Sequence, residues 1–248
     1  MSELKQVQRQ TGVALWRQIA DRIRIAIAEG RYDATGMVPT EARLSAEFGV
    51  NRHTVRSALA ALAQEGIVQS IQGRGTLILK RDRITFPISK RTRFTPGIAG
   101  QARHLEAVLL DSVIEPATRE IAGYLNLTEG NPVLRLEGLR KGDGVALSRA
   151  TSWFPLPRFE GMDAAYRQTG SITEAFAALG LSDYLRVKTE ISATHADESD
   201  RKELGLSPGA IVLTTKALNT DLSAEPVQYA ITRFPADRVQ FMIDNSAG

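Results

Sequence analysis

Residues 38–78 constrain the fold more than any other stretch, because they encode two short helices, a tight turn and a small hairpin in that order. We expect Thr40 to cap the first helix, since its hydroxyl can accept a bond from a free backbone N–H group. Leu44 and Phe48 give this helix an apolar edge, and Gly49 is a typical helix end. The pattern predicts a helical hairpin followed by a β-ribbon.

The second helix is expected to start after the cap residue Asn51, to run to Glu65 and to stop at Gly66. Its core positions fall at helical spacing and are Val55, Ala58, Leu59 and Leu62. Its first turn is polar and cationic and contains Arg52, His53, Thr54 and Arg56. Cations at a helix N-terminus cost about 0.3–1 kcal/mol each. DNA phosphates would offset that cost, so the pattern favours a nucleic-acid partner.

The hairpin is predicted from two β-prone runs, Ile67–Ile71 and Thr76–Leu79, with residues 72–75 at the tip. The tip has no bulky apolar side chain and carries one cation, so it suits insertion into a minor groove. The alternative is a helical hairpin and ribbon whose basic face is only solvated. The residues predicted to contact DNA are Thr40, Arg43, Asn51, Arg52, His53, Thr54, Arg56, Gln72, Gly73 and Arg74.

This stretch resembles the winged helix-turn-helix of the GntR family of bacterial transcription regulators. The matching residues are Pro39-Thr40-Glu41, Leu44, Phe48-Gly49-Val50-Asn51-Arg52, Thr54-Val55-Arg56, Ala58-Leu59, Leu62, Glu65-Gly66 and Gly73-Arg74-Gly75-Thr76. So many fixed spacings are more specific than a lone helix-turn-helix pattern. The resemblance implies a DNA-binding domain over residues 1–80.

The basic residues are concentrated at the front of the chain. Residues 1–81 contain 12 lysines and arginines against 7 acidic residues, whereas residues 82–248 contain 19 against 21. A basic front part favours a nucleic-acid partner. The chain has no cysteine, no signal peptide and no apolar run near the ~20 residues that span a membrane. We therefore expect a cytoplasmic protein without membrane contact.

The remaining pattern predicts one more N-terminal helix, Ala14–Glu29, and a second domain. A short charged linker is predicted over residues 81–85, and the second domain over residues 86–248. That domain is expected to be α+β with a mainly antiparallel sheet. Its expected strands are Leu105–Ile114, Pro132–Lys141, Val145–Phe154, Leu185–Thr194, Ala210–Thr220, Val227–Phe234 and Val239–Ile243, and its expected helices are Thr118–Leu125, Ser171–Leu179 and Ser199–Leu204.

The second domain resembles the effector-binding (UTRA) domain of the HutC subfamily, whose fold is similar to chorismate lyase. Pieces of both domains are most similar to PhnF-type repressors of phosphonate-utilisation operons. The pieces that carry this resemblance are Asn51-Arg52-His53-Thr54, Phe86-Pro87-Ile88, Arg93-Phe94, Leu139-Arg140, Gly142-Asp143-Gly144, Val145-Ala146-Leu147, Ile191-Ser192-Ala193 and Tyr229. The resemblance implies a two-domain regulator whose second domain binds an effector and mediates dimerisation.

The residues give no sign of a catalytic or metal site. His53, His104 and His195 lie in separate elements, and the chain has no Gly-rich phosphate loop and no nucleophile elbow. Similarity to a lyase fold does not carry activity. We therefore expect no enzyme activity, no metal and no cofactor, with an enzyme on the lyase-like fold as the alternative.

Two arginines lie on predicted strands beside apolar residues, where an unpaired cation is rare. Alternation puts Arg140 on the same side as Leu134 and Leu136, and Arg149 on the same side as Leu147. Both arginines also have simpler explanations. Arg140 can lie at a strand end and reach solvent, and Arg149 can pair with a glutamate across the sheet.

Residues 90–93 open the second domain with three cations and a hydroxyl, although Lys90 and Arg91 are most simply explained as linker charges. Convergent cations and hydroxyls are what a phosphate or phosphonate needs. Relatives that bind amino-sugar phosphates have an acidic residue where this chain has Ala150, which argues for a smaller or differently decorated anion. The HutC resemblance implies effector contacts from Thr92, Arg93, Arg140, Ser171, Tyr229 and Thr232.

Together these features predict a transcriptional repressor that binds a palindromic double-stranded DNA operator as a homodimer. A small anionic effector, a phosphonate, phosphate or related compound, is expected to control its operator affinity. The regulated genes would serve phosphonate uptake or utilisation. The alternatives are a HutC-type regulator of sugar-phosphate or amino-acid catabolism, and a structural DNA-binding protein without an effector.

Overall fold

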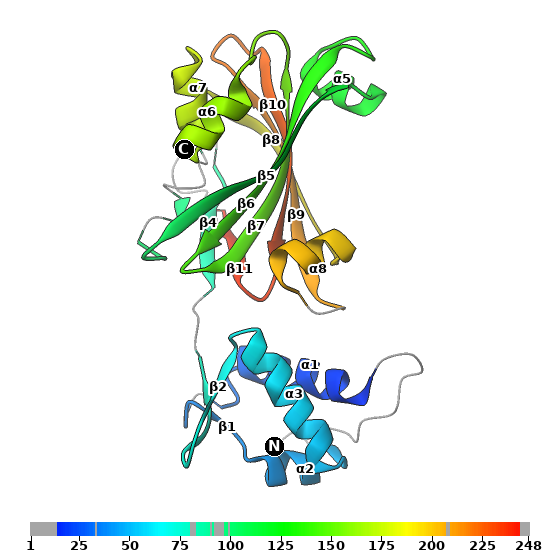
Figure 1. The fold of residues 1–248 in the computed structure, drawn as a ribbon, viewed down its shortest axis with the longest axis vertical. Helices are drawn as coiled ribbons and strands as arrows, with labels where there is room; N and C mark the ends of the chain where they lie inside the picture. The colour runs from blue at the N-terminus through cyan, green and yellow to red at the C-terminus, as the bar shows by residue number, and fades with distance from the viewer. Residues whose placement is uncertain are drawn as a thin grey trace. The chain divides into compact units, whose positions relative to one another are not determined.

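The computed structural model describes residues 14–32, 34–79, 83–89, 91, 97–98, 100–206 and 209–243. The chain divides into two compact units, residues 1–81 and residues 82–248 (Figure 1). Each unit has a hydrophobic core of its own. Among the described residues, no helix has both the length and the apolar character needed to cross a membrane.

The first unit is a winged helix-turn-helix, as predicted. Its helices are α1 (Leu15–Ala28), α2 (Glu41–Phe48) and α3 (Arg52–Gln64), and its sheet has the order β1 (Met37–Val38), β3 (Gly75–Ile78), β2 (Val68–Ile71). Local signals set the helix ends. Thr40 and Asn51 accept N-cap hydrogen bonds, and Gly49 ends α2 in the left-handed conformation, with φ of 66°.

The core of this unit is an apolar cluster in which α1 packs against α2 and α3. Ile19 and Ile23 of α1, Leu44 of α2 and Leu62 of α3 are fully buried. Burying each of these side chains stabilises the unit by about 1.5–3 kcal/mol. The cluster fixes the angle between the two helices of the helix-turn-helix, and so the direction in which the first turn of α3 points.

The second unit is built on one six-stranded antiparallel sheet, which confirms the predicted α+β fold. Its strand order is β5-β6-β7-β10-β9-β8. The strands are β5 (Leu105–Pro116), β6 (Pro132–Gly142), β7 (Val145–Pro155), β8 (Leu185–His195), β9 (Ile211–Thr220) and β10 (Pro226–Pro235). The β6–β7 hairpin turns at Asp143 and Gly144, whose φ angles of 50° and 78° suit a two-residue loop.

A separate pair of parallel strands, β4 (Ile84–Pro87) and β11 (Val239–Met242), joins the start of this unit to its end. Phe86 of β4 packs on Phe234 of β10, with ring centroids 5.3 Å apart. The pairing corrects the predicted linker over residues 81–85, because Ile84 and Thr85 belong to β4. Residues 80–82 lie outside the described part of the chain.

Helices cover both faces of the sheet (Figure 1). The helices are α5 (Arg119–Leu125), α6 (Met162–Thr169), α7 (Ile172–Ala178) and α8 (Glu198–Leu204). Alternation along β6 shows how each face is used. Leu134 and Leu136 pack with α6 and α7 on one face, whereas Val133 packs with α5 and Leu139 with α8 on the other. The sequence pattern does not predict α6.

The face that carries α5 and α8 also holds a network of ion pairs. Arg149 of β7 pairs with Glu137 of β6 at 2.9 Å and approaches Asp200 of α8 at 3.7 Å. Arg233 of β10 lies 3.3 Å from the same Asp200, whose side chain is 1% exposed. Arg149 is therefore a structural cation that pairs with a glutamate across the sheet, which was the simpler of the two explanations.

Leu147 and Arg149 do not share a side of the sheet, contrary to the alternation argument. The β6–β7 register shifts between Arg140 and Lys141. Leu147 packs in the cluster of Phe86 on the α6–α7 side, whereas Arg149 faces α8. A bulge of this kind reverses the side on which one residue lies.

Candidate nucleic-acid interface and ligand pocket

The first turn of α3 presents polar side chains and contains no acidic residue. Asn51 caps the helix, and its Oδ1 accepts hydrogen bonds from the backbone N–H and the hydroxyl of Thr54 at 2.8 and 2.9 Å. Arg52 and His53 follow and are exposed. Their side chains stand beside the backbone N–H groups that a helix leaves unpaired at its N-terminus. This end of α3 suits an anionic partner.

Arg56, one turn further along α3, is held by α2. Its Nε and Nη2 donate to the carboxylate of Glu41 at 3.1 and 2.8 Å. These hydrogen bonds hold the pKa of the Glu41 carboxyl below its usual value. Glu41 therefore stays ionised, and it competes with any phosphate for Arg56.

The other predicted DNA contacts lie on α2 and at the hairpin tip. Thr40 Oγ1 accepts a hydrogen bond from the backbone N–H of Arg43 at 3.4 Å, and Arg43 is exposed. Gln72, Gly73 and Arg74 are exposed at the tip. Gly73 has a φ of 76°, and apart from its chain neighbours no described residue has an atom within 4 Å of the position a Cβ would take. The glycine therefore serves the backbone conformation of the turn, not the packing within this unit.

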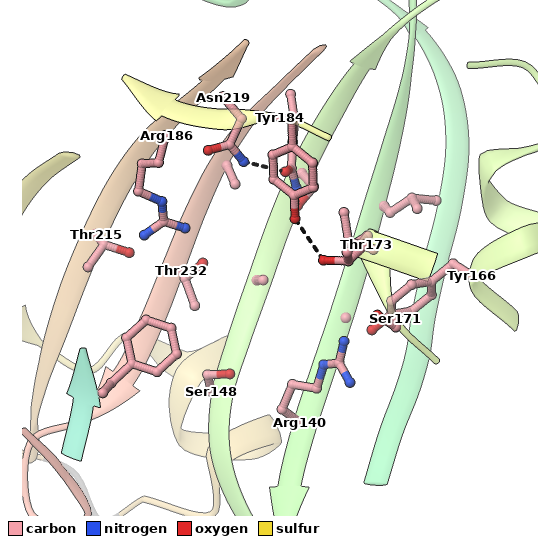
Figure 2. A pocket seen from close by; sticks show the side chains of 18 of the residues that line it. Arg140, Ser148, Tyr166, Ser171, Thr173, Tyr184, Arg186, Thr215, Asn219 and Thr232 are labelled. Carbon is pink, nitrogen blue, oxygen red and sulfur yellow. Dashed lines mark hydrogen bonds between the residues drawn. The ribbon is translucent and has the colours of Figure 1, made fainter. Parts of the chain in front are cut away.

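A cavity of about 250 Å³ lies between the sheet of the second unit and helices α6 and α7 (Figure 2). Its polar lining residues are Arg140, Ser148, Ser152, Ser171, Thr173, Glu174, Tyr184, Arg186, Thr215, Asn219, Gln228 and Thr232. Phe86, Leu136 and Phe234 are among the apolar ones. Two arginines among hydroxyls and amides in one cavity suit a small anion with polar substituents.

The two arginines enter the cavity from different strands, Arg140 from β6 and Arg186 from β8. The guanidinium carbon of Arg140 lies 5.7 Å from the centroid of the Tyr166 ring. Figure 2 shows this guanidinium on the side of Tyr166 and Ser171. Burial raises the pKa of the Tyr166 phenol above its usual value, although Arg140 acts against that shift. The phenol therefore stays neutral at physiological pH.

Hydroxyl and amide side chains occupy the other end of the cavity. Thr173 Oγ1 and Tyr184 Oη lie 2.9 Å apart. Asn219 Nδ2 donates to Gln228 Oε1 at 2.7 Å, and Gln228 Nε2 donates to Ser152 Oγ at 3.0 Å. These bonds form a continuous chain of three polar side chains along one end of the cavity.

Three of the predicted effector contacts meet in this cavity. Arg140 comes from β6, Ser171 from the N-cap of α7 and Thr232 from β10. Ala150 of β7 also lines the cavity. Elements far apart in the sequence thus bring the predicted residues together.

Tyr229 does not line the cavity, which corrects its predicted role as an effector contact. It lies three positions before Thr232 on β10, and residues an odd number apart on a strand point to opposite faces. Its ring stacks on Tyr124 of α5, with centroids 4.0 Å apart, and packs against Trp153. Burial raises the pKa of its phenol. Tyr229 is therefore a core residue beneath α5.

Thr92 and Arg93 lie outside the described residues, but their neighbour Arg91 is placed. Its Nη1 donates to both carboxylate oxygens of Asp183 at 2.6 Å. Asp183 directly precedes Tyr184, which lines the cavity. Arg91 is thus ion-paired with a residue of the second unit and is not only a solvated linker charge.

Sequence reasoning did not select Arg186, Asn219 or Gln228. The two amides lie in predicted strands, where a buried polar side chain is rare unless it is hydrogen-bonded. Their presence there could have marked them as candidates. Recognising that Asn219 and Gln228 are partners requires the β9–β10 register. That register is set by contacts between the strands, and the sequence of either strand alone does not determine it.

Both units match known protein families. Residues 15–78 match bacterial regulatory proteins of the gntR family, and residues 100–240 match the UTRA domain. Over 240 residues the chain is 56% identical to an uncharacterized HTH-type transcriptional regulator of Rhizobium meliloti (strain 1021), covering 97% of this chain and 98% of that protein. Over 241 residues it is 30% identical to "Probable transcriptional regulator PhnF" of Escherichia coli (strain K12), covering 93% and 95%. The crystal structure of PhnF from Mycobacterium smegmatis has a similar fold, with a TM-score of 0.59 and 24% identity, covering 91% of this chain and all of that one.

Proposed function

The chain belongs to the GntR family of bacterial transcriptional regulators, is of the HutC type with a UTRA domain and is not an enzyme, and from this premise we propose a specific mode of regulation. It is a cytoplasmic repressor that binds a palindromic operator as a homodimer. A small phosphonate or phosphate compound in the UTRA cavity releases it from the operator. The regulated genes serve phosphonate uptake or utilisation.

The observation that best supports this function is the presence of Arg140, Arg186 and several hydroxyls in one cavity. A guanidinium binds phosphonate oxygens through two parallel hydrogen bonds, and hydroxyls complete the shell around the anion. Ala150 supports a phosphonate over an amino-sugar phosphate, because the site lacks an acid at that position for sugar hydroxyls.

Thr92 and Arg93 are proposed to belong to the same anion site. The support is the family resemblance, together with their neighbour Arg91, which pairs with Asp183, the residue before the cavity-lining Tyr184. In this proposal Arg93, two positions further along the chain, contributes to the site. With Arg140 it would bind the anion from two separate segments.

Release of the operator follows from the geometry of dimeric helix-turn-helix proteins. Two recognition helices must fit half-sites whose centres are about 34–36 Å apart on the duplex. An effector that alters the spacing of the two α3 helices therefore lowers operator affinity. A coupling free energy of about 1–3 kcal/mol is enough to shift that affinity by roughly 5–150-fold.

A sugar phosphate is the second candidate effector, because Glu174 lines the cavity and its carboxylate can accept hydrogen bonds from sugar hydroxyls. Thermal-shift measurements on the full chain with methylphosphonate, inorganic phosphate and glucosamine 6-phosphate separate the two. A ligand that binds only the folded state raises the Tm. Stabilisation by glucosamine 6-phosphate alone would replace the phosphonate assignment. If no anion raises the Tm or changes operator affinity, the proposed effector control is wrong.

We expect Arg52→Ala to weaken operator binding by about 1–3 kcal/mol while the fold is retained. If Arg52 contacts a guanine edge, specificity relaxes at one base pair. If it contacts only phosphate, the weakening is uniform and the salt slope falls by about one. Anisotropy titrations against the operator and its single-base variants at two salt concentrations distinguish these cases.

Arg56 provides the comparison for that experiment, because Glu41 already binds it. Arg56→Ala should weaken operator binding less than Arg52→Ala. Glu41→Gln should strengthen operator binding, since it frees Arg56 for a phosphate. Unchanged affinity in both arginine variants would remove α3 from the DNA interface.

Gly73 tests the role of the hairpin tip. We expect Gly73→Asn to reduce operator affinity and to change the Tm by less than about 2 °C, because Asn tolerates the left-handed conformation at φ of 76°. Gly73→Val should lower both affinity and Tm, since a β-branched residue is strained there. Wild-type affinity in the Gly73→Asn protein would show that the tip does not approach the groove.

A further inference from the structure

One end of the cavity is lined by polar side chains that have no role in the proposed anion site. Asn219, Gln228 and Ser152 form the amide and hydroxyl chain, and each residue is no more than 5% exposed. The free end of this chain is Asn219 Oδ1, which is buried and has no hydrogen-bond partner among the described residues. A buried acceptor without a donor is destabilising, so it points to a donor that arrives from outside the protein.

Arg186 brings a positive charge to the same end. It is the cross-strand partner of Asn219 in the β8–β9 register, and both side chains line the cavity (Figure 2). A group bound here must donate to Asn219 and must also be compatible with a guanidinium. A hydroxyl satisfies both, because one oxygen can donate and accept. An ammonium group can donate a hydrogen bond but is repelled by Arg186. A methyl group can neither donate nor accept a hydrogen bond.

This end of the cavity is well separated from Arg140. Arg140 pairs in register with Ser148 of β7, and Ser152 lies four residues further along that strand. The separation along β7 is about 13 Å, at 3.3–3.4 Å per residue. The cavity has a volume of about 250 Å³. An anion as small as methylphosphonate, bound at Arg140, would leave the Asn219 end unfilled.

We infer that the effector is an elongated anion with a neutral hydroxyl at its far end. Its phosphonate or phosphate group binds at Arg140, and its hydroxyl donates to Asn219 Oδ1 and accepts from Arg186. This rests on the proposed anion site and adds the other half of the ligand. The class it selects is hydroxyalkyl phosphonates and phosphates, in preference to aminoalkyl and plain alkyl ones.

Three phosphonates that differ only in their last group test this selection: butylphosphonate, 3-hydroxypropylphosphonate and 3-aminopropylphosphonate. Calorimetric titration of the full chain should give the hydroxyl compound the lowest Kd. The advantage over each of the others should be about 5–150-fold, the range expected for one unsatisfied buried polar group.

Asn219→Asp is the variant that should reverse the ranking. It keeps the shape and the acceptor of the side chain and adds a negative charge. Gln228 can turn its amide, so that Nε2 donates to the aspartate and Oε1 accepts the hydroxyl proton of Ser152. The preference should move to 3-aminopropylphosphonate, and a Tm close to that of the wild type would show that the fold is kept.

Two results would overturn the inference: equal affinity of the wild type for the butyl and hydroxypropyl compounds, or the same ranking in Asn219→Asp as in the wild type. If all three bind equally and Arg140→Ala abolishes binding, the anion site stands and the hydroxyl end is wrong. If neither these compounds nor methylphosphonate nor phosphate binds, the proposed function fails together with the inference.

Discussion

Arg140→Ala and Arg93→Ala proteins are expected to bind the operator as tightly as the wild type and to keep it bound when the anion is added. Operator binding should persist because the winged unit is untouched. Removing either guanidinium leaves the anion with an unpaired charge, which costs about 2–5 kcal/mol of ligand binding. That loss corresponds to a roughly 30- to 4,000-fold higher ligand concentration for release. In the cell the operon would stay repressed.

The measurement is an operator titration with and without methylphosphonate or the anion that gives the largest thermal shift. Arg158→Ala is the matched control, because Arg158 pairs with Asp221 at 2.6 Å and does not line the cavity. It should respond as the wild type does. A variant that still releases DNA at the wild-type ligand concentration removes that arginine from the site. If both variants do so, the anion site is wrong.

Asp200→Ala is expected to lower the free energy of unfolding of the second unit by about 3–5 kcal/mol. Asp200 is buried, and its carboxylate lies 3.7 Å from Arg149 and 3.3 Å from Arg233. It also completes the capping box of α8 with Asp197. Replacing it by alanine removes a carboxylate partner from two partly buried guanidinium groups, those of Arg149 and Arg233, and it also removes one cap interaction.

The two units must be observed separately, because a two-domain chain need not unfold in one step. The chain has two tryptophans, Trp16 in the first unit and Trp153 in the second. In a Trp16→Phe background, fluorescence during urea unfolding reports the second unit alone. Asp197→Ala is the control, since its half-exposed side chain supplies mainly a cap, worth about 0.5–2 kcal/mol. A loss in Asp200→Ala no larger than in Asp197→Ala would contradict the buried-charge explanation.

The parts of the fold that follow from local chemistry could be predicted from the sequence. Thr40, Asn51 and Thr118 accept the N-cap bonds expected of them, and Gly49 ends α2. The Asp143-Gly144 turn forms the predicted hairpin. In each case the deciding interaction lies within four residues, so the local sequence is sufficient.

The parts that depend on distant partners could not be predicted. β4 is a strand because it pairs with β11, which lies at the other end of the unit's sequence. The charged residues before β4 instead predict a linker. Helix α6 begins after Gly161 without a side-chain cap, so no start signal marks it.

In the candidate site, too, some features could be predicted from the sequence and others could not. Strand alternation places Arg140 with Leu134 and Leu136 on the α6–α7 face correctly. The family pattern placed Tyr229 in the same pocket as Thr232, although the two are an odd number of residues apart and face opposite sides. For Leu147 the alternation itself misleads, because the bulge in the β6–β7 pair lies between strands and leaves no mark in either sequence.

Phe86 places the cavity close in sequence to the start of the second unit. It lines the cavity from β4, the strand with which the second unit begins, and it follows Arg81, the last residue of the first unit, by five positions. In the described sheet β4 has one neighbouring strand, β11. If an effector controls operator binding, as proposed, contact with Phe86 would let it act directly on β4, the first strand of the second unit.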